Sequence, residues 1–390
     1  MTPQTENLDK VISFSLMSFV CFSFFSISLT QISCGIGGLA WMAKCQLTRS
    51  WGKQTFPLKI PFVLFVLACL VAVVGAVDLS GSYKSLKRLL EILIFFWAVN
   101  CITSEEQRER LSLLLIASAT LSTLTGFYTA WENGVTIYSR AEGTMSVYMT
   151  YAGLLMLALL VASGKLIFAS KENKWLYPAI ILMGVCLLLT FTRQAWLGGL
   201  AGVSFLIWFR KKSLLWFMPV ILGVTLLISP ADIRKRIDSL INLNDPNLQI
   251  RLALWQGGWL VFKDHLLTGC GFKCIDAVNQ DYPDPTDNIK KLRGLHNNFV
   301  QLAVDTGLFG VVSWISIWVV YFMTLYRRLV SMPDNFVCRR DTMASAAAVV
   351  GFLVAGLFES NFYDAEVSMV LYFIMALPLT RETVRNSPMN

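Results

Sequence analysis

A histidine and two asparagines stand directly before a long apolar run, in the stretch GLHNNFVQLAVDTGLFG at residues 294–310. The chain contains only two histidines, and His296 is the one that precedes this apolar run. A neutral imidazole can take a proton from a hydroxyl group near neutral pH, which makes His296 a candidate general base. The alternative is a helix cap or a hydrogen bond to loop carbonyls. Asn297 and Asn298 either orient the imidazole or cap the helix that follows.

Arginines at the ends of other apolar runs could bind an anion. Arg193, in FTRQAWLGG, lies between two apolar runs with scarcely a loop, where a charge is costly unless it meets an anion or a carboxylate. Arg251 begins a tryptophan-rich stretch. A guanidinium binds phosphate through two parallel N–H groups, so we expect both arginines to bind phosphate. The alternative is a long side chain that reaches lipid headgroups. The same two interpretations apply to Arg88.

The composition identifies the elements that must position these residues. Hydrophobic residues make up 55% and charged residues 15% of the 390 residues, whereas soluble domains carry about 25% charged residues. The mean hydropathy is +0.58. Apolar runs of bilayer-spanning length alternate with short charged clusters, so we predict an all-α, polytopic helical membrane protein. The expected spans lie near 11–24, 28–43, 60–77, 86–103, 110–130, 147–168, 175–192, 194–209, 213–229, 296–325, 342–359 and 365–380.

The basic residues orient these spans. Residues 11–43 are long for one helix and short for two, but with two helices more than half of the basic residues fall in cytoplasmic segments. We therefore predict about twelve transmembrane helices in a single integral membrane domain, residues 1–390, with both termini cytoplasmic. The net charge of +8 then reflects topology, and no nucleic-acid partner is expected. This orientation places residues 230–295 and His296 on the outer face.

Residues 230–295 form the one large loop, between predicted helices 9 and 10. The stretch RLALWQGGWLVFKDHLL suits a helix lying along the membrane interface. His265, within it, is expected to be structural. Asp281, Asp284 and Asp287 recur at every third residue, but the intervening prolines favour a solvated loop over a calcium site. Cys270 and Cys274 could form a disulfide if this face is oxidising, although their spacing alone does not decide it.

Three segments resemble the O-antigen ligase/polymerase superfamily. They are FTRQAWLGG (191–199), RLALWQGGWLVFKDHLLTGCGF (251–272) and GLHNNFVQLAVDTGLFG (294–310). Each segment alone is weakly specific. Together they resemble the superfamily in their order, their spacing and their common side of the membrane over roughly residues 130–320. The resemblance implies a GT-C-like fold. It also associates Arg140, in SRAEGTMS, with a variable arginine–glycine element of that family.

The resemblance further implies a glycosyltransferase of the bacterial inner membrane with a periplasmic active site. The expected donor is a glycan on undecaprenyl pyrophosphate, and the expected acceptor is a sugar hydroxyl of lipid A–core. Within this scheme Arg193, Arg251, Arg140 and Arg88 bind substrate and His296 is catalytic. Asn297 and Asn298 could also bind sugar hydroxyls. Membrane lipids are the remaining partners. We expect no metal and no cofactor, because arginines can supply the positive charge.

Three alternatives to an O-antigen ligase remain. An O-antigen polymerase uses the same donor with a lipid-linked acceptor, and a protein O-oligosaccharyltransferase is a further relative. A transporter of small anions would carry paired charges deep within several spans. Ionisable residues inside the predicted spans are few, Glu91 being the clearest, which favours chemistry at the interface.

Overall fold

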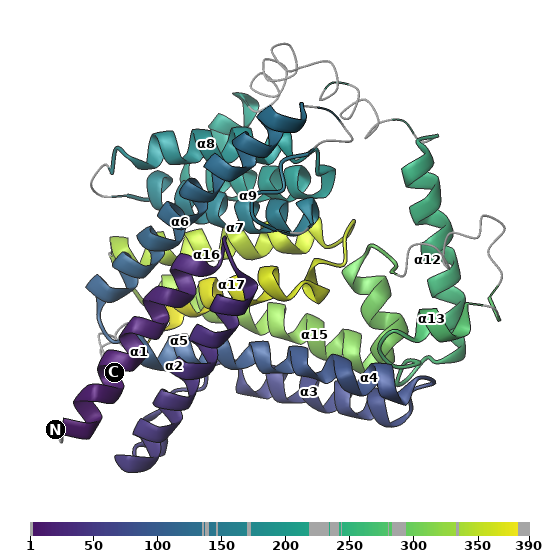
Figure 1. Ribbon diagram of the computed structural model, residues 1–390, viewed down its shortest axis with the longest axis horizontal. Coiled ribbons are helices and arrows are strands. Elements are labelled where there is room, and N and C mark those ends of the chain that lie inside the picture. Colours follow the sequence, from purple (N-terminus) through teal and green to yellow (C-terminus); the bar gives the residue numbers. More distant parts are fainter. Residues whose placement is uncertain are drawn as a thin grey trace.

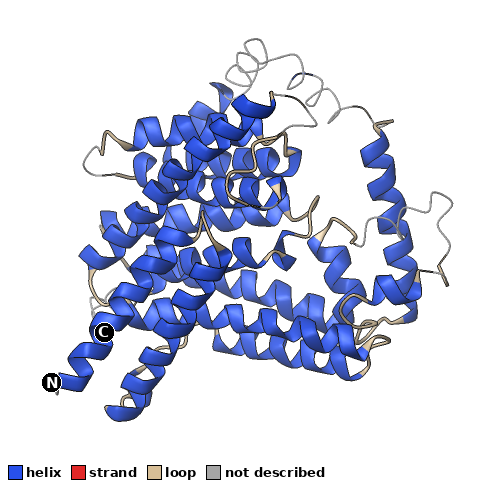
Figure 2. Ribbon diagram, in the orientation of Figure 1, coloured by secondary structure: helices blue, strands red, loops and turns tan. Residues whose placement is uncertain are grey.

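The computed structural model describes most of the chain as helices. The described residues are 3–134, 136, 140–145, 147–169, 173–217, 234, 242, 244–279, 281–282, 294–332 and 335–380. Within them no strand is present (Figure 2). The predicted span at 213–229 and much of the loop at 230–295 fall largely outside these ranges.

The helices follow one another as α1 (Pro3–Phe22), α2 (Ile27–Leu47), η1 (Trp51–Lys53), α3 (Lys59–Val74), α4 (Leu79–Ser85), η2 (Leu86–Glu91), α5 (Ile92–Cys101), α6 (Glu105–Asn133), α7 (Tyr148–Ile167), α8 (Leu176–Leu189), α9 (Arg193–Lys211), η3 (Lys212–Phe217), α12 (Pro246–Asp264), α13 (Cys274–Val278), α15 (Asn298–Ser331), α16 (Phe336–Ala355), η4 (Asn361–Tyr363), α17 (Ala365–Ala376) and η5 (Leu377–Leu379). In Figure 1 most of them lie across the picture. The start of α1 is at the left, and α12 and α13 are at the right.

The apolar run at residues 11–43 forms two helices, as the basic residues predicted. Helix α1 ends at Phe22 and α2 begins at Ile27. Ser26 begins α2 as its N-cap, because its hydroxyl accepts a hydrogen bond from the Leu29 amide. The two helices then pack against each other as neighbours.

Three described helices are long and apolar enough to cross a membrane: Glu105–Glu132, Tyr148–Ile167 and Asn298–Ser331. Shorter apolar helices at Lys59–Val74, Leu176–Leu189 and Ala365–Leu379 accompany them. Lengths of about 20 residues match the thickness of a bilayer core. The chain is thus a helical membrane protein.

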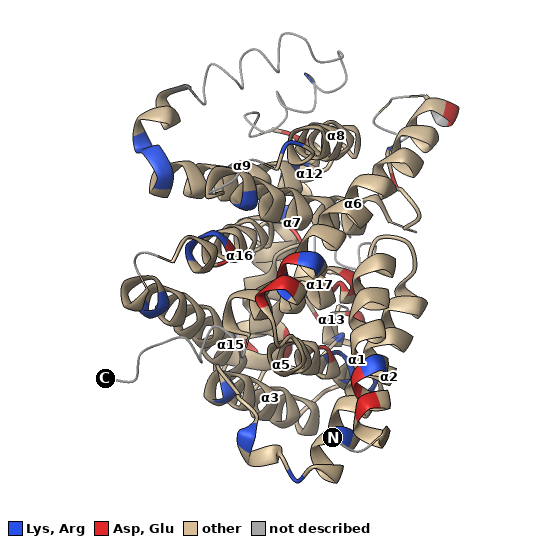
Figure 3. Cartoon of the chain, turned by 90° about the vertical axis from the view of Figure 1, so that its left-hand side faces the viewer, with Lys and Arg blue, Asp and Glu red and all other residues tan. Residues whose placement is uncertain are grey.

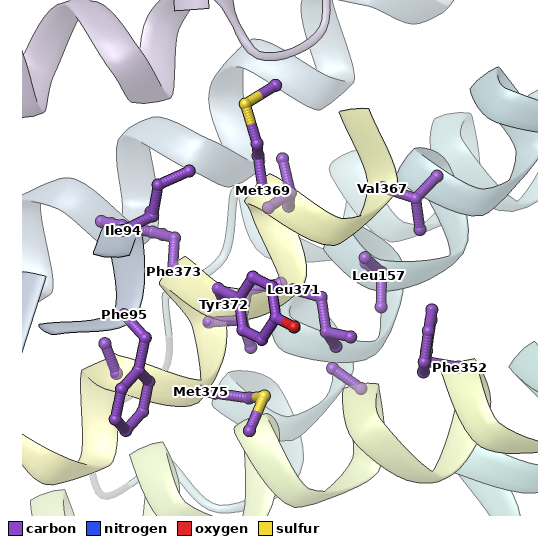
Figure 4. Close-up of a cluster of buried hydrophobic side chains, with 14 of the residues drawn as sticks. Ile94, Phe95, Leu157, Phe352, Val367, Met369, Leu371, Tyr372, Phe373 and Met375 are labelled. Carbon is purple, nitrogen blue, oxygen red and sulfur yellow. The ribbon is translucent and has the colours of Figure 1, made fainter. Parts of the chain in front are cut away.

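Helix α7 runs through the centre of the bundle. Its side chains are buried along almost the whole length, and it packs against α6, α8, α9, α16 and α17. Figure 4 shows how Leu157 of α7, Phe95 of α5, Phe352 of α16 and Phe373 of α17 contribute to one apolar cluster. All four side chains are fully buried. This core supports the two helices, α9 and α16, that lead to the candidate site.

Helices α9 and α16 approach closely because glycines face each other. A Cβ atom added at Gly198 would lie 2.5 Å from the carbonyl oxygen of Gly351, which is too close for any side chain. Small residues at helix contacts in membranes allow this approach. The contact fixes the start of α9 relative to the segment that follows α16.

Helix α15 is broken where the sequence predicted one continuous span at 296–325. Gly307 has φ 63° and ψ −164° inside the helix, and an added Cβ would lie 2.4 Å from the backbone of Leu267. The preceding loop fills the break: the Leu308 amide donates to the Leu266 carbonyl at 2.8 Å, and the Cys270 amide donates to Val304 at 2.9 Å. Backbone groups freed at a break inside a membrane protein must be satisfied in this way.

A buried ionic cluster joins α6, α7 and α16 at the end of the bundle seen in Figure 3. Arg108 Nε lies 2.7 Å from Asp341 Oδ2, and these side chains are 3% and 5% exposed. Lys165 Nζ lies 2.6 Å from Glu109 Oε2 and 3.5 Å from Asp341. Arg340 pairs with both carboxylates. Because several cations share each carboxylate, loss of one anion leaves buried charge without compensation.

Asp341→Ala is therefore expected to lower the free energy of unfolding by about 3–5 kcal/mol, the range for removal of one partner of a buried ion pair. Glu106→Ala removes an exposed partner, 3.3 Å from Arg110, and should change stability by about 0.3–0.5 kcal/mol. Denaturant unfolding of both variants in detergent measures the difference. Equal stabilities would show that the cluster does not stabilise the bundle.

Candidate active site

His296 lies in a strained backbone conformation immediately before α15. Its φ of 47° is in the left-handed region, which residues other than glycine rarely adopt. The next residue, Asn297, caps α15: its side-chain oxygen accepts from the amides of Phe299 at 2.8 Å and Val300 at 3.1 Å. The cap and the strained residue together fix the direction in which the imidazole leaves the chain.

Asn297 and Asn298 also attach the start of α15 to the segment after α16. Asn297 Nδ2 donates to the Leu357 carbonyl at 2.9 Å. Asn298 is fully buried, its side-chain oxygen accepts from the Phe362 amide at 3.0 Å, and its Nδ2 donates to Asn361. Of the roles that the sequence left open for the two asparagines, the structure shows the cap, and it is Asn297 that forms it.

Glu359 connects the predicted residues, and the sequence interpretation did not single it out. His296 Nδ1 lies 2.9 Å from Glu359 Oε1, with side chains 22% and 15% exposed. Gln194 Nε2 donates to Glu359 Oε2 at 3.2 Å. Arg251 Nη2 lies 3.8 Å from the same oxygen, and Arg251 Nη1 donates to the Phe358 carbonyl. One carboxylate thus joins the histidine, an arginine of α12 and the first turn of α9.

Arg193 lies beside this group and pairs with a second carboxylate. Its Nη2 is 3.4 Å from Asp245 Oδ1, and both side chains are largely buried. Asp245 is also the N-cap of α12, accepting from the amides of Asn247 and Leu248. Burial raises the pKa of Asp245, but Arg193 and these donors outweigh burial and hold the pKa below its usual range. The pair joins the start of α9 to the start of α12.

The two arginines are close enough to influence each other. Burial lowers the pKa of Arg251, Glu359 opposes this effect, and the positive charge of Arg193 lowers the pKa further. Such repulsion between guanidinium groups favours an anion bound near both of them.

Arg140 and Arg88 stack on aromatic rings. The Arg140 guanidinium lies 4.1 Å from the centre of the Tyr148 ring at the start of α7. The neighbouring Ala141 amide donates to the Leu189 carbonyl at 3.0 Å, which fixes this loop against the end of α8. The Arg88 guanidinium lies 5.1 Å from the centre of the Tyr363 ring. A stacked guanidinium keeps its N–H groups at its edge, where an anion can reach them.

A cavity of about 1010 Å³ begins at Glu359 and extends along α2 and α5. Three segments line it: α2, the stretch from η2 into α5, and the residues after α16. They contribute, in that order, Gly35, Gly38, Leu39 and Met42; Lys87, Arg88 and Leu93; and Glu359, Asn361 and Asp364. The α2 side is mainly apolar and the opposite side carries charge. Burial raises the pKa of Asp364 to about 8, and a hydrogen bond with Glu366 raises it too. A raised pKa favours the neutral form of this carboxyl, which lowers its repulsion of an anion.

The structure therefore brings His296, Arg251 and Arg193 together, places Arg88 in the cavity that Glu359 also lines, and puts Arg140 at the start of α7. The missed residues are Glu359, Gln194 and Asp245. The sequence carried one signal for Glu359: it is an acidic residue at the end of the predicted span 342–359, within LFESNFYDAE, just before the short segment that leads to the last span. That end of the span lies on the same predicted side as His296.

The second histidine and the cysteine pair follow α12 in the chain. Cys270 and Cys274 form a disulfide with Cα atoms 5.7 Å apart, a normal separation for such a bond. Through the Cys270 amide, this turn is attached to the break in α15. His265 is the C-cap residue of α12, in keeping with the structural interpretation.

Comparison with known proteins agrees with this geometry. Residues 178–315 match the family described as O-antigen ligase, a segment that begins in α8 and ends in α15. No curated protein matches the chain. The matched segment contains Arg193, Arg251 and His296, and the resemblance implies a membrane enzyme that transfers lipid-linked glycans. Over residues 178–315, about a third of the chain, the protein is therefore similar to the O-antigen ligase family.

Proposed function

We propose that the protein ligates an O-antigen glycan from undecaprenyl pyrophosphate onto a sugar hydroxyl of lipid A–core. The observation that carries the proposal is that His296 and Arg251 share the carboxylate of Glu359, which lines a cavity with an apolar wall. Arg193, which pairs with Asp245, lies close enough to Arg251 to influence its charge. Such a site offers a base, a phosphate-binding pair and space for a lipid in one place. We also propose that the reaction is metal-independent.

The donor's two parts fit the two sides of the site. An isoprenoid chain would lie along the apolar α2 side of the cavity, where its methyl and methylene groups are removed from water. The diphosphate would lie between Arg193 and Arg251, with Arg88 and Arg140 as further cations. Guanidinium groups hold phosphate oxygens bidentately and stabilise charge that develops on the leaving oxygen.

The transfer step needs one base and one stabilised leaving group. His296 removes the proton from the acceptor hydroxyl as the oxygen attacks the anomeric carbon. The bond between that carbon and the diphosphate breaks, and its electron pair remains on the phosphate oxygen beside the arginines. Attack opposite to the leaving group inverts the anomeric configuration. The proton is left on the imidazole.

The proposed setting is the bacterial inner membrane, with about twelve spans, a GT-C-like arrangement and both termini cytoplasmic. Residues 1–390 would form one membrane domain, and residues 230–295 a periplasmic loop with α12 along the interface. Two features support this orientation. The candidate site lies at the α12 end of the bundle, and α1 begins at the opposite end (Figure 1). The exposed Trp259, Leu260 and Leu267 of the α12 region suit an interface.

A reconstituted assay tests this function. Purified protein is given an undecaprenyl-pyrophosphate-linked glycan and lipid A–core, with and without a chelator of divalent cations, and the products are separated on a gel. We expect glycan-capped lipid A–core at equal rates in both samples. Elongation of the lipid-linked glycan alone would identify a polymerase, and loss of product with chelator would remove the metal-independent mechanism.

A further inference from the structure

The carboxylate of Glu359 divides its two oxygens between different partners. Oε1 contacts His296 Nδ1 at 2.9 Å and accepts from the Ser360 amide at 3.1 Å. Oε2 accepts from Gln194 Nε2 at 3.2 Å and lies 3.8 Å from Arg251 Nη2. A largely buried carboxylate must be compensated by such partners. The backbone amide and Gln194 hold its orientation, whereas the histidine and the arginine are the two groups with a role in the proposed reaction.

We propose that Glu359 is a positioning residue that couples donor binding to the strength of the His296 base. The inference rests on the proposed glycan transfer and deepens it. When the Arg251 site is empty, Glu359 shares its charge between the arginine and the imidazole. When the donor diphosphate binds Arg251, the charge of Glu359 is left to the imidazole alone.

The contact with His296 determines which nitrogen is the base. If Nδ1–H donates to Glu359 Oε1, the lone pair of the neutral ring lies on Nε2. The main chain of His296 is already fixed by its left-handed φ of 47° and by the Asn297 cap. The carboxylate therefore holds the remaining freedom, the rotation of the ring, and stabilises the imidazolium that forms when Nε2 takes the acceptor proton.

The contact with Arg251 is the weaker of the two. At 3.8 Å it is an ion pair longer than a normal hydrogen bond, while Nη1 of the same guanidinium donates to the Phe358 carbonyl. A phosphate oxygen offers Nη2 a shorter, charge-assisted bond. The backbone contact can keep Arg251 in place while Nη2 turns to the donor. The base then gains strength only with the donor bound, which limits proton removal in its absence.

Glu359→Gln separates this role from a structural or donor-binding one. An amide keeps the size of the side chain and can still accept from Nδ1, but it has no charge. We expect kcat to fall about 100-fold, within the range for general base catalysis. We expect the donor KM to stay equal or to fall, because Arg251 loses a competing carboxylate. Glu359→Asp should restore part of kcat.

Glu132→Gln serves as the matched control, since Glu132 is exposed and lies outside the cavity lining. Its kcat and KM should equal those of the wild type. Binding of undecaprenyl diphosphate, measured by intrinsic tryptophan fluorescence, tests the competition without turnover: Glu359→Gln should bind it at least as tightly as the wild type. Thermal unfolding in detergent verifies that the variant is folded.

The outcomes separate the two proposals. A wild-type protein without ligase activity overturns the proposed function. An active wild type whose Glu359→Gln variant keeps its kcat, or binds undecaprenyl diphosphate more weakly, overturns the coupling by Glu359 alone. A lower kcat with equal or tighter binding supports the coupling.

Discussion

His296→Ala is expected to lower the rate of glycan transfer by about 10²- to 10⁴-fold, the contribution of a well-placed general base. The variant loses the nitrogen that takes the acceptor proton, and no other histidine lies near the site. The donor should still bind, because Arg193 and Arg251 remain. The measurement is a time course of glycan transfer by purified protein at saturating donor.

His265→Ala provides the matched control for this variant. His265 is the second of the two histidines, ends α12, and forms no part of the group around Glu359. Its replacement should leave the rate near that of the wild type. Substantial transfer by His296→Ala, at equal amounts of inserted protein, would remove the assignment of the base.

Arg193→Lys is expected to reduce kcat/KM for the donor by about 10- to 100-fold. Lysine keeps the positive charge but cannot form two parallel N–H bonds to phosphate. Loss of one charge-assisted hydrogen bond corresponds to about 1.5–3 kcal/mol. An ammonium can still pair with Asp245, so the attachment of α9 to α12 should survive. Initial rates at varied donor concentration give the value.

Arg110→Lys is the comparison for that substitution, because Arg110 is exposed at the opposite end of the bundle and pairs with Glu106. It should have no effect on kcat/KM. If Arg193→Lys behaved in the same way, Arg193 would not bind the donor phosphate in a bidentate manner.

The sequence predicted the helical elements well where apolar length and charge position decide them. The two-helix interpretation of residues 11–43 followed from the distribution of lysines and arginines, and α1 and α2 confirm it. The break at Gly307 could not be predicted in this way. One glycine in an apolar run is compatible with a continuous helix, and the break requires backbone partners from residues 266–270, far away in sequence.

The number of spans stays a prediction. Apolar segments such as Lys59–Val74 and Leu176–Leu189 are shorter as helices than the runs that predicted them. Sequence hydropathy does not distinguish a residue facing lipid from one facing the bundle, since both environments are apolar. The described part of the chain provides three helices that meet the length and composition of a span.

The candidate site was predictable where a residue type stands out locally. His296 and Arg193 lie at the ends of apolar runs, where a polar or charged side chain is costly unless it has a binding partner. Glu359 was missed because its meaning depends on a contact with a residue 63 positions away, and because it stands at the end of a predicted span. Gln194 and Asp245 likewise acquire a role only when α9, α12 and α16 are packed together.

The most direct test of the account is an experimental structure of the protein bound to undecaprenyl diphosphate. The account predicts the diphosphate in contact with both Arg193 and Arg251, beside His296, with the isoprenoid chain in the cavity along α2. A diphosphate bound elsewhere, or one that contacts neither guanidinium, would contradict it.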